Sequence, residues 1–159
     1  MLPKLNVLFL CTGNSCRSQM GEGWARSLHG DAINAYSAGL IAKGLKPHAV
    51  AVMREAGVDI TGQRSQTLDE VMAELGDNPG DEKIDVVITV CGHAHETCPV
   101  FPGGATIIHR GFDDPPALAE NEPDPEVAIG HYRRVRDEIR DYVQNLPQVL
   151  SERRVARAT

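Results

Sequence analysis

The residues from Cys11 to Ser18 have types and a spacing that could bind an anion and attack it. Their sequence is Cys-Thr-Gly-Asn-Ser-Cys-Arg-Ser. They follow the apolar run 5–10, which predicts a buried strand, and they precede the pattern of 19–28, which predicts a helix. A turn from strand to helix points backbone N–H groups and the positive end of the helix dipole at one spot. We therefore expect an oxyanion there, with the Arg17 guanidinium donating to two of its oxygens.

Cys11 stands at the first position of this loop, where the same positive field favours its thiolate over its thiol. Ser18 could hydrogen-bond that thiolate or, alternatively, its own helix backbone. Gly13 and Asn14 tolerate the positive φ that a loop wrapped around an anion needs. The residues expected to surround the anion are Thr12, Gly13, Asn14, Ser15, Cys16, Arg17 and Ser18. The alternative is an ordinary strand–helix turn that contains a buried cysteine.

A second set of reactive side chains follows another apolar run, 84–90. The set consists of Cys91, His93, His95 and Cys98, all of which could ligate zinc. Their spacing differs from that of paired zinc-knuckle sites, and the sequence holds no second cluster of this kind. We expect a cytosolic protein, in which cysteines are more typical of catalytic, redox or metal-binding roles than of structural disulfides.

The composition restricts the partners of the protein. The chain has 159 residues, a formal net charge of -6 and 4% aromatic residues. An acidic chain with few aromatic side chains is a poor match for nucleic acid, although a local group of N–H donors can still bind a small anion. No stretch approaches the ~20 apolar residues of a membrane span, so we expect a cytoplasmic protein that does not enter a membrane.

Strand and helix patterns alternate along the chain. Further strands are expected at 32–39, 84–90 and 105–109, and further helices at 47–56, 67–75 and 125–145. Pro47 and Gly57 are suited to bound the helix 47–56, and Thr67 with Glu70 has the spacing of a capping box. The inner face of the last helix is expected to hold Val127, Tyr132, Val135, Ile139, Tyr142 and Val143.

This alternation predicts an α/β fold. We expect a single doubly wound domain over 1–150, with a central four-stranded parallel sheet flanked by helices, and a flexible tail at 151–159. Ligands of such folds bind at the carboxyl ends of the strands. Cys11 and Cys91 each follow a buried strand, so they should lie close together. Asp114 precedes Pro115 after the strand 105–109 and could reach the same place, or simply begin a turn.

The loop, read as Cys-Thr-Gly-Asn-Ser-Cys-Arg-Ser-Gln-Met, resembles the phosphate-binding loop of low-molecular-weight protein tyrosine phosphatases. It is still more similar to that of their relatives, the thioredoxin-coupled arsenate reductases. The likeness runs from Val7 to about Val143 and includes the segments 36–39, 111–115 and 134–139. It implies the low-molecular-weight phosphatase-like fold.

Two features favour the reductases over the phosphatases. Cys91 and Cys98 lie seven positions apart, as in the three-cysteine reductases, and a phosphatase has no use for this pair. The phosphatase relatives carry an aromatic pair after the Asp-Pro, where this chain has Pro116 and Ala117. The remaining alternatives are a tyrosine phosphatase and a thiol redox sensor or metal-binding module.

The resemblance implies a mechanism. Cys11 attacks arsenate held by the loop and Arg17, Asp114 protonates the leaving oxygen, Cys91 attacks Cys11, and Cys98 then resolves that disulfide. Thioredoxin, or alternatively a glutaredoxin, would reduce the Cys91–Cys98 disulfide. If 91–98 were helical, the two cysteines would stand about 10.5 Å apart along the axis. A disulfide needs Cα atoms within about 4.4–6.8 Å, so we expect this segment to unwind.

No bound cofactor is expected, except for the potassium ion that the same resemblance raises as a possibility. Some relatives hold a potassium ion through oxygen ligands that match Asn14, Glu22 and Ser37. A carboxylate that they also use is replaced here by Gln66. We therefore expect a weaker potassium site or none.

Overall fold

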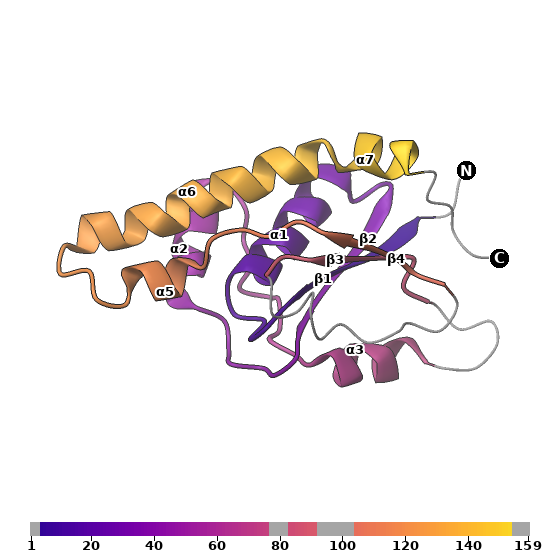
Figure 1. The fold of residues 1–159 in the computed structure, drawn as a ribbon, viewed down its shortest axis with the longest axis horizontal. Coiled ribbons are helices and arrows are strands. Elements are labelled where there is room, and N and C mark those ends of the chain that lie inside the picture. Colours follow the sequence, from indigo (N-terminus) through magenta and orange to yellow (C-terminus); the bar gives the residue numbers. More distant parts are fainter. Residues whose placement is uncertain (1–3, 77–82, 92–103, 154–159) are drawn as a thin grey trace.

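The computed structural model describes residues 4–76, 83–91 and 104–153. Its strands are β1 (Leu5–Cys11), β2 (Ile33–Gly39), β3 (Val86–Thr89) and β4 (Thr106–His109). They form one parallel sheet in the order β2-β1-β3-β4, which Figure 1 shows nearly edge-on. The predicted four-stranded parallel sheet is confirmed.

The register of the strands brings several carboxyl ends to one edge of the sheet. Cys11 pairs with Gly39 of β2, and Leu10 pairs with Thr89 of β3. The N–H of Val90 donates to the carbonyl of Leu10 at 2.9 Å, so the chain remains beside β1 for one residue beyond β3. Cys91 comes next, which places it and Cys11 at the same edge as expected.

The two central strands are buried on both faces, as expected of a parallel sheet covered by helices. The fully buried apolar members are Val7, Leu8, Phe9 and Leu10 of β1 and Val86, Val87 and Ile88 of β3. The helix that follows β1 adds Met20 and Trp24 to this core. Burial of side chains of this size stabilises the fold by roughly 1.5–3 kcal/mol each.

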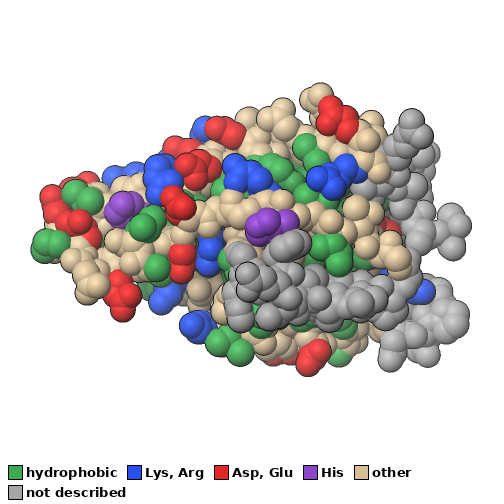
Figure 2. Space-filling view, in the orientation of Figure 1, with side chains coloured by type: hydrophobic (Ala, Val, Ile, Leu, Met, Phe, Trp, Pro, Cys, Tyr) green, Lys and Arg blue, Asp and Glu red, His purple; other side chains and the backbone are tan. Residues whose placement is uncertain are grey.

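Helices cover both faces of the sheet. On one side lie α1 (Arg17–His29), α2 (Pro47–Glu55) and the long α6 (Pro125–Gln144), and α3 (Leu68–Leu75) lies on the other side (Figure 1). Acidic and basic side chains are interspersed over the surface near α6 in Figure 2. Part of this pattern joins helices, because Arg133 of α6 donates to Glu55 of α2 at 2.7 Å.

The ends of the helices follow their sequence signals. Pro47 is at the start of α2, and Gly57 after it adopts a positive φ of 86°, a conformation in which glycine carries no steric penalty. The Thr67 hydroxyl accepts the N–H of Glu70 at 3.2 Å, which caps α3 as predicted. Asp124 caps α6 in the same way through the N–H of Glu126.

The sequence patterns led to one error and two omissions. Val127 is 45% exposed, so its predicted place on the inner face of α6 is wrong. The first turns of α6 project beyond the sheet, where no core covers them (Figure 1). The short helices α5 (Pro115–Ala119) and α7 (Leu146–Glu152) were not predicted, because each is too short for a periodic apolar pattern.

No helix of the described ranges, between residues 4 and 153 outside the gaps, combines the length and apolar character that a membrane crossing requires.

Candidate active site

A pocket of about 260 Å³ opens at the edge of the sheet where β1 ends. Its lining residues are Cys11, Thr12, Gly13, Ser15, Cys16, Arg17, Lys43, Lys46, Asp114 and Pro116. The loop 11–17 contributes most of this wall, and the segments after β2 and β4 contribute the rest. The structure therefore brings the predicted nucleophile, the predicted guanidinium and the predicted acid to one cavity.

A buried network of hydrogen bonds supports Cys11. Its Sγ lies 2.9 Å from the Ser18 hydroxyl, and Ser18 in turn accepts the side-chain amide of Asn14 at 2.8 Å. The Asn14 Oδ1 accepts the N–H of Gln66 at 2.8 Å and the side-chain amide of Gln19 at 3.1 Å. Of the two partners expected for Ser18, the structure thus places Cys11 within reach.

The loop takes its curvature from Asn14, whose φ of 47° makes it the one non-glycine residue with positive φ among the described residues. Asparagine tolerates this left-handed conformation better than most side chains. Gly39 at the end of β2 lies directly behind it, because a Cβ there would stand 2.7 Å from the Asn14 nitrogen. The left-handed conformation predicted for Asn14 is confirmed, whereas Gly13 does not adopt a positive φ.

The carbonyls of the loop are bonded to the segment 40–46. The carbonyls of Cys11, Thr12, Gly13 and Ser15 accept N–H groups from Leu40, Ile41, Lys43 and Lys46. Between described residues, no hydrogen bond uses the backbone N–H groups of 13–16. These donors remain available for an anion at the start of α1, where the helix dipole adds to their effect.

Arg17 and Asp114 both line the pocket and lie close to each other. The Arg17 guanidinium donates to the carbonyl of Phe112 at 3.0 Å, and another of its nitrogens lies 3.6 Å from an Asp114 carboxylate oxygen. Arg17 is mostly buried and Asp114 is 42% exposed. Asp113 points elsewhere and pairs with Arg134 of α6 at 3.1 Å, which anchors the loop that carries Asp114.

Cys91 reaches the loop from the neighbouring strand. It is 5% exposed, and its Sγ lies 3.3 Å from the hydroxyl of Thr12, the residue after Cys11. Sequence reasoning placed the two cysteines at one edge but did not identify Thr12 as the contact between them. Cys98, His93 and His95 lie outside the described residues, as does the predicted unwinding of 91–98. Within the described ranges, no cluster of side chains suited to a metal ion is found.

Cys16 lines the pocket beside Cys11, but its thiol differs from that of a nucleophile. It is 2% exposed, and burial, with Asp114 nearby, raises the pKa of its thiol far above the ordinary value. It therefore stays protonated and acts as a small packing residue. Burial, followed by the influence of Cys16, raises the pKa of Tyr132 on α6 to about 12.

The oxygens matched to a potassium site are already accepting hydrogen bonds. Asn14 Oδ1 accepts from Gln66 and Gln19, the carbonyl of Ser37 accepts the Gln66 side-chain amide at 3.1 Å, and Glu22 accepts the Ser37 hydroxyl at 2.7 Å. The Gln66 side chain is 7% exposed among these groups and donates where a cation would need an acceptor. These residues therefore do not fit a bound potassium ion.

Two pocket residues, Lys43 and Lys46, were missed by sequence reasoning. A usable signal existed, because both follow the strand 32–39, whose carboxyl end was expected at the same edge as Cys11. Pro116 lines the pocket at the position where the phosphatase relatives are expected to carry an aromatic side chain. No aromatic residue of the described ranges lines the pocket.

Comparisons with known proteins agree with this geometry. The family model for low molecular weight phosphotyrosine protein phosphatase matches residues 6–156. A protein named arsenate reductase from Halalkalibacterium halodurans is 47% identical over 133 residues, which cover 84% of this chain and 88% of that protein.

Solved structures with the same fold come from both groups. The structure of an arsenate reductase in the phosphate binding state has a TM-score of 0.69 and 32% identity, and covers 91% of this chain and 98% of that one. The tyrosine phosphatase amsI of Erwinia amylovora has a TM-score of 0.70 over 94% of this chain and 95% of its own, and at 17% identity it shows the fold alone. The chain belongs to the low molecular weight phosphotyrosine protein phosphatase family and, within it, groups with the proteins named arsenate reductases.

Proposed function

We propose that this protein is an arsenate reductase in which Cys11, Cys91 and Cys98 pass a disulfide from the active site to a dithiol reductant. The observation that supports it most is the contact between the two strand ends. Cys11 lies beneath an oxyanion pocket, and Cys91 lies 3.3 Å from the next residue of the same loop. A hydrolytic enzyme needs the first thiol but not the second.

The first step forms a covalent adduct. The Cys11 thiolate attacks arsenic, a bond between sulfur and arsenic forms, and one arsenic–oxygen bond breaks. Asp114 donates a proton to the departing oxygen, which leaves as water. The N–H groups of 13–16 and the Arg17 guanidinium stabilise the negative charge on the remaining oxygens, and they are already oriented before the substrate arrives.

The second step transfers the electrons. The Cys91 thiolate attacks the Cys11 sulfur, the sulfur–arsenic bond breaks, and its electron pair stays on arsenic, which leaves as arsenite. A Cys11–Cys91 disulfide remains. Cys98 then attacks Cys91, so that Cys11 returns as a thiolate and the disulfide passes to Cys91–Cys98. An external dithiol reduces this disulfide and completes the cycle.

The external reductant in this proposal is thioredoxin, with a glutaredoxin as the alternative, and the reaction takes place in the cytoplasm. We further propose that no potassium ion is needed, because Gln66 supplies hydrogen bonds at the place where relatives would use a carboxylate. The small volume of the pocket suits arsenate or phosphate without a larger organic group.

The decisive experiment is thioredoxin-coupled oxidation of NADPH with arsenate as substrate, in the wild type and in Cys98→Ser. The wild type should give sustained turnover. Cys98→Ser should release about one arsenite per protein and stop as a Cys11–Cys91 disulfide, which peptide mass spectrometry identifies. Many turnovers by Cys98→Ser with thioredoxin would contradict the relay, and absence of arsenite from the wild type with either reductant would contradict the function.

A second candidate function is the hydrolysis of a phosphate ester, because Cys11, Arg17 and Asp114 line the pocket without any need of Cys91. The absence of an aromatic lining residue from the described ranges argues against phosphotyrosine as its main substrate. Cys91→Ser separates the two functions. It should leave hydrolysis of a small aryl phosphate within about twofold of the wild type and should abolish arsenite release.

A further inference from the structure

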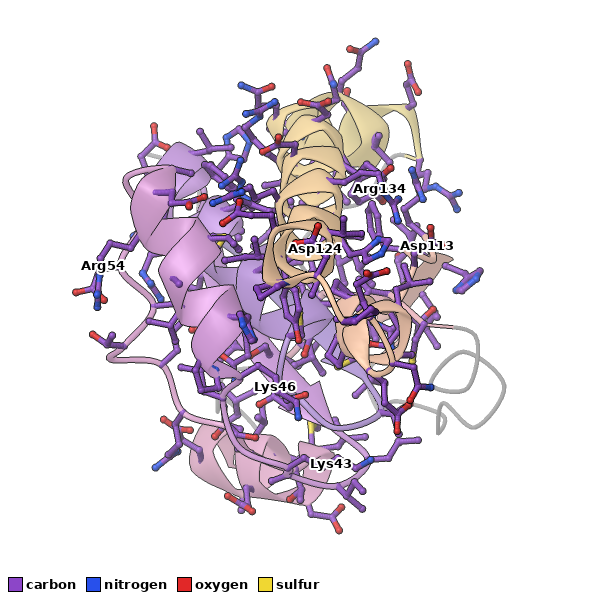
Figure 3. All side chains as sticks on the ribbon, turned by 90° about the vertical axis from the view of Figure 1, so that its left-hand side faces the viewer. Lys43, Lys46, Arg54, Asp113, Asp124 and Arg134 are labelled. Carbon is purple, nitrogen blue, oxygen red and sulfur yellow. The ribbon has the colours of Figure 1, made fainter. Side chains whose placement is uncertain are left out.

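Lys43 and Lys46 line the pocket, yet no step of the proposed chemistry uses them. They belong to the segment 40–46 that joins β2 to α2. Figure 3 looks at the end of the molecule where this segment lies and shows both lysines on it. Arg54 of α2, by contrast, points away from the rest of the protein in the same view.

The backbone of both lysines is fixed to the anion-binding loop. The N–H of Lys43 donates to the carbonyl of Gly13, and the N–H of Lys46 donates to the carbonyl of Ser15, each at 2.9 Å. The aliphatic stem of Lys43 also packs on Gly13, because a Cβ there would lie 3.0 Å from the Lys43 Cδ. The backbone that carries both lysines is therefore tethered to the loop at the rim of the pocket.

The charge at this rim is not balanced locally. No ion pair between described residues includes Lys43 or Lys46. The one carboxylate that lines the pocket, Asp114, lies 3.6 Å from Arg17. In a chain with a net charge of -6, the pocket is thus a local concentration of positive charge. Such a concentration attracts anions in proportion to their charge and is weakened by salt.

We infer that Lys43 and Lys46 form an outer anion-binding rim that selects doubly charged tetrahedral oxyanions over singly charged ones. The N–H groups of the loop and Arg17 hydrogen-bond to the oxygens of a tetrahedral anion, and both classes of anion have this shape. The lysines attract the anion by its charge, which is larger in one class than in the other. The inference deepens the proposed function, because dianionic arsenate is such a ligand, but anion selection itself needs no reduction.

The test uses sulfate and perchlorate, which are both tetrahedral and do not change protonation near neutral pH. Binding is followed by NMR shifts of the loop amides in the double variant Lys43→Gln/Lys46→Gln. At ~20 mM salt we expect the dissociation constant to rise about tenfold for sulfate and about threefold for perchlorate, because the lost Coulomb energy scales with ligand charge. At ~300 mM salt both changes should shrink to about twofold or less.

A double variant with the same loss of charge elsewhere serves as the control. Arg54 points away from the pocket, and Lys83 precedes β3 at the opposite end of the sheet. Arg54→Gln/Lys83→Gln should bind both anions as the wild type does. Equal losses of sulfate and perchlorate binding, losses that persist in high salt, or a control that behaves like the double lysine variant would each overturn the inference.

The steady-state kinetics provide a second measurement. For Lys43→Gln/Lys46→Gln the KM for arsenate should rise about tenfold in low salt while kcat stays within about twofold. A fall in kcat with an unchanged KM would instead assign the lysines to the chemical step and contradict a role in selection. If the wild type selects sulfate over perchlorate through these lysines but does not reduce arsenate, the proposed function fails and the anion rim stands.

Discussion

Cys11 and Cys91 lie at the ends of neighbouring strands, but the structure holds them in different ways. Cys11 rests on a buried network that runs through Ser18 and Asn14 to Gln66. Cys91 follows a strand of only 4 residues and contacts Thr12 across the edge of the sheet. In the proposed relay, the first thiol keeps its place beneath the bound oxyanion, and the second attacks it from the neighbouring strand end.

The largest effects should come from the two thiols themselves. Cys11→Ser should abolish both adduct formation and arsenite release, because a serine hydroxyl is not ionised near neutral pH. Cys91→Ser should still form the Cys11–arsenic adduct but release no arsenite. Intact-protein mass spectrometry after rapid quenching checks both outcomes. Identical behaviour of the two variants would remove the distinction between the cysteines.

Asn14→Ala should give the next largest effect, on stability as well as on activity. It places alanine at a φ of 47° and leaves the buried backbone N–H of Gln66 without its acceptor. Together these losses amount to about 2–4 kcal/mol of unfolding free energy. Chemical denaturation checks the value. Asn14→Gly tolerates the φ but loses the amide, so it should recover part of the stability and little of the activity.

A smaller effect should distinguish the contact between Ser18 and Cys11 from the contact between Thr12 and Cys91. Ser18→Ala removes the hydroxyl that lies 2.9 Å from Cys11, and the alkylation of Cys11 by iodoacetamide near pH 7 should slow about tenfold, the effect of a hydrogen bond worth ~1.5 kcal/mol. Thr12→Val should leave that rate within about twofold and slow formation of the Cys11–Cys91 disulfide. If both variants slow the same step, the two thiols are not supported separately.

The smallest effect lies at the outer edge of the network, at Glu22. Burial raises the pKa of this carboxyl above its ordinary value of 4.5, against the hydrogen bond from Ser37. The folded state therefore favours the protonated form, and stability is lost as the pH rises through the raised pKa. Glu22→Gln should match the wild type near pH 4 and melt about 1–3 °C higher near pH 8. Thermal melts across this range measure it, and a lower melting temperature near pH 8 would contradict it.

Much of the fold was predictable because its signals are local. The apolar β-branched run at 84–90 could only be a buried strand, and Pro47, Gly57 and Thr67 mark helix ends by their own chemistry. The loop 11–18 was predictable because a strand, small residues and a helix follow one another without interruption. Its placement beside Cys91 followed from the rule that parallel strands end at one edge.

The missed features depend on contacts between distant segments. In the sequence, Lys43 and Lys46 resemble ordinary surface residues. They line the pocket because their backbone N–H groups donate to carbonyls of the loop. Thr12 contacts Cys91 only because the register of β1 and β3 brings the ends of both strands to the same edge of the sheet. Val127 has a residue type suited to a core, but α6 extends past the sheet before any core begins. No pattern within one segment contains this information.

The burial of Cys16 has a consequence for the fidelity of electron transfer. In a series of thiol–disulfide exchanges, a further thiolate close to the reacting cysteines can attack an intermediate disulfide and form an unproductive one. Cys16 lies in the same loop as Cys11 but is buried and remains protonated. It is therefore a poor nucleophile at the pH of the cell. In the proposed relay, the fourth cysteine of the chain therefore stays within the active-site loop without diverting the disulfide from Cys11, Cys91 and Cys98.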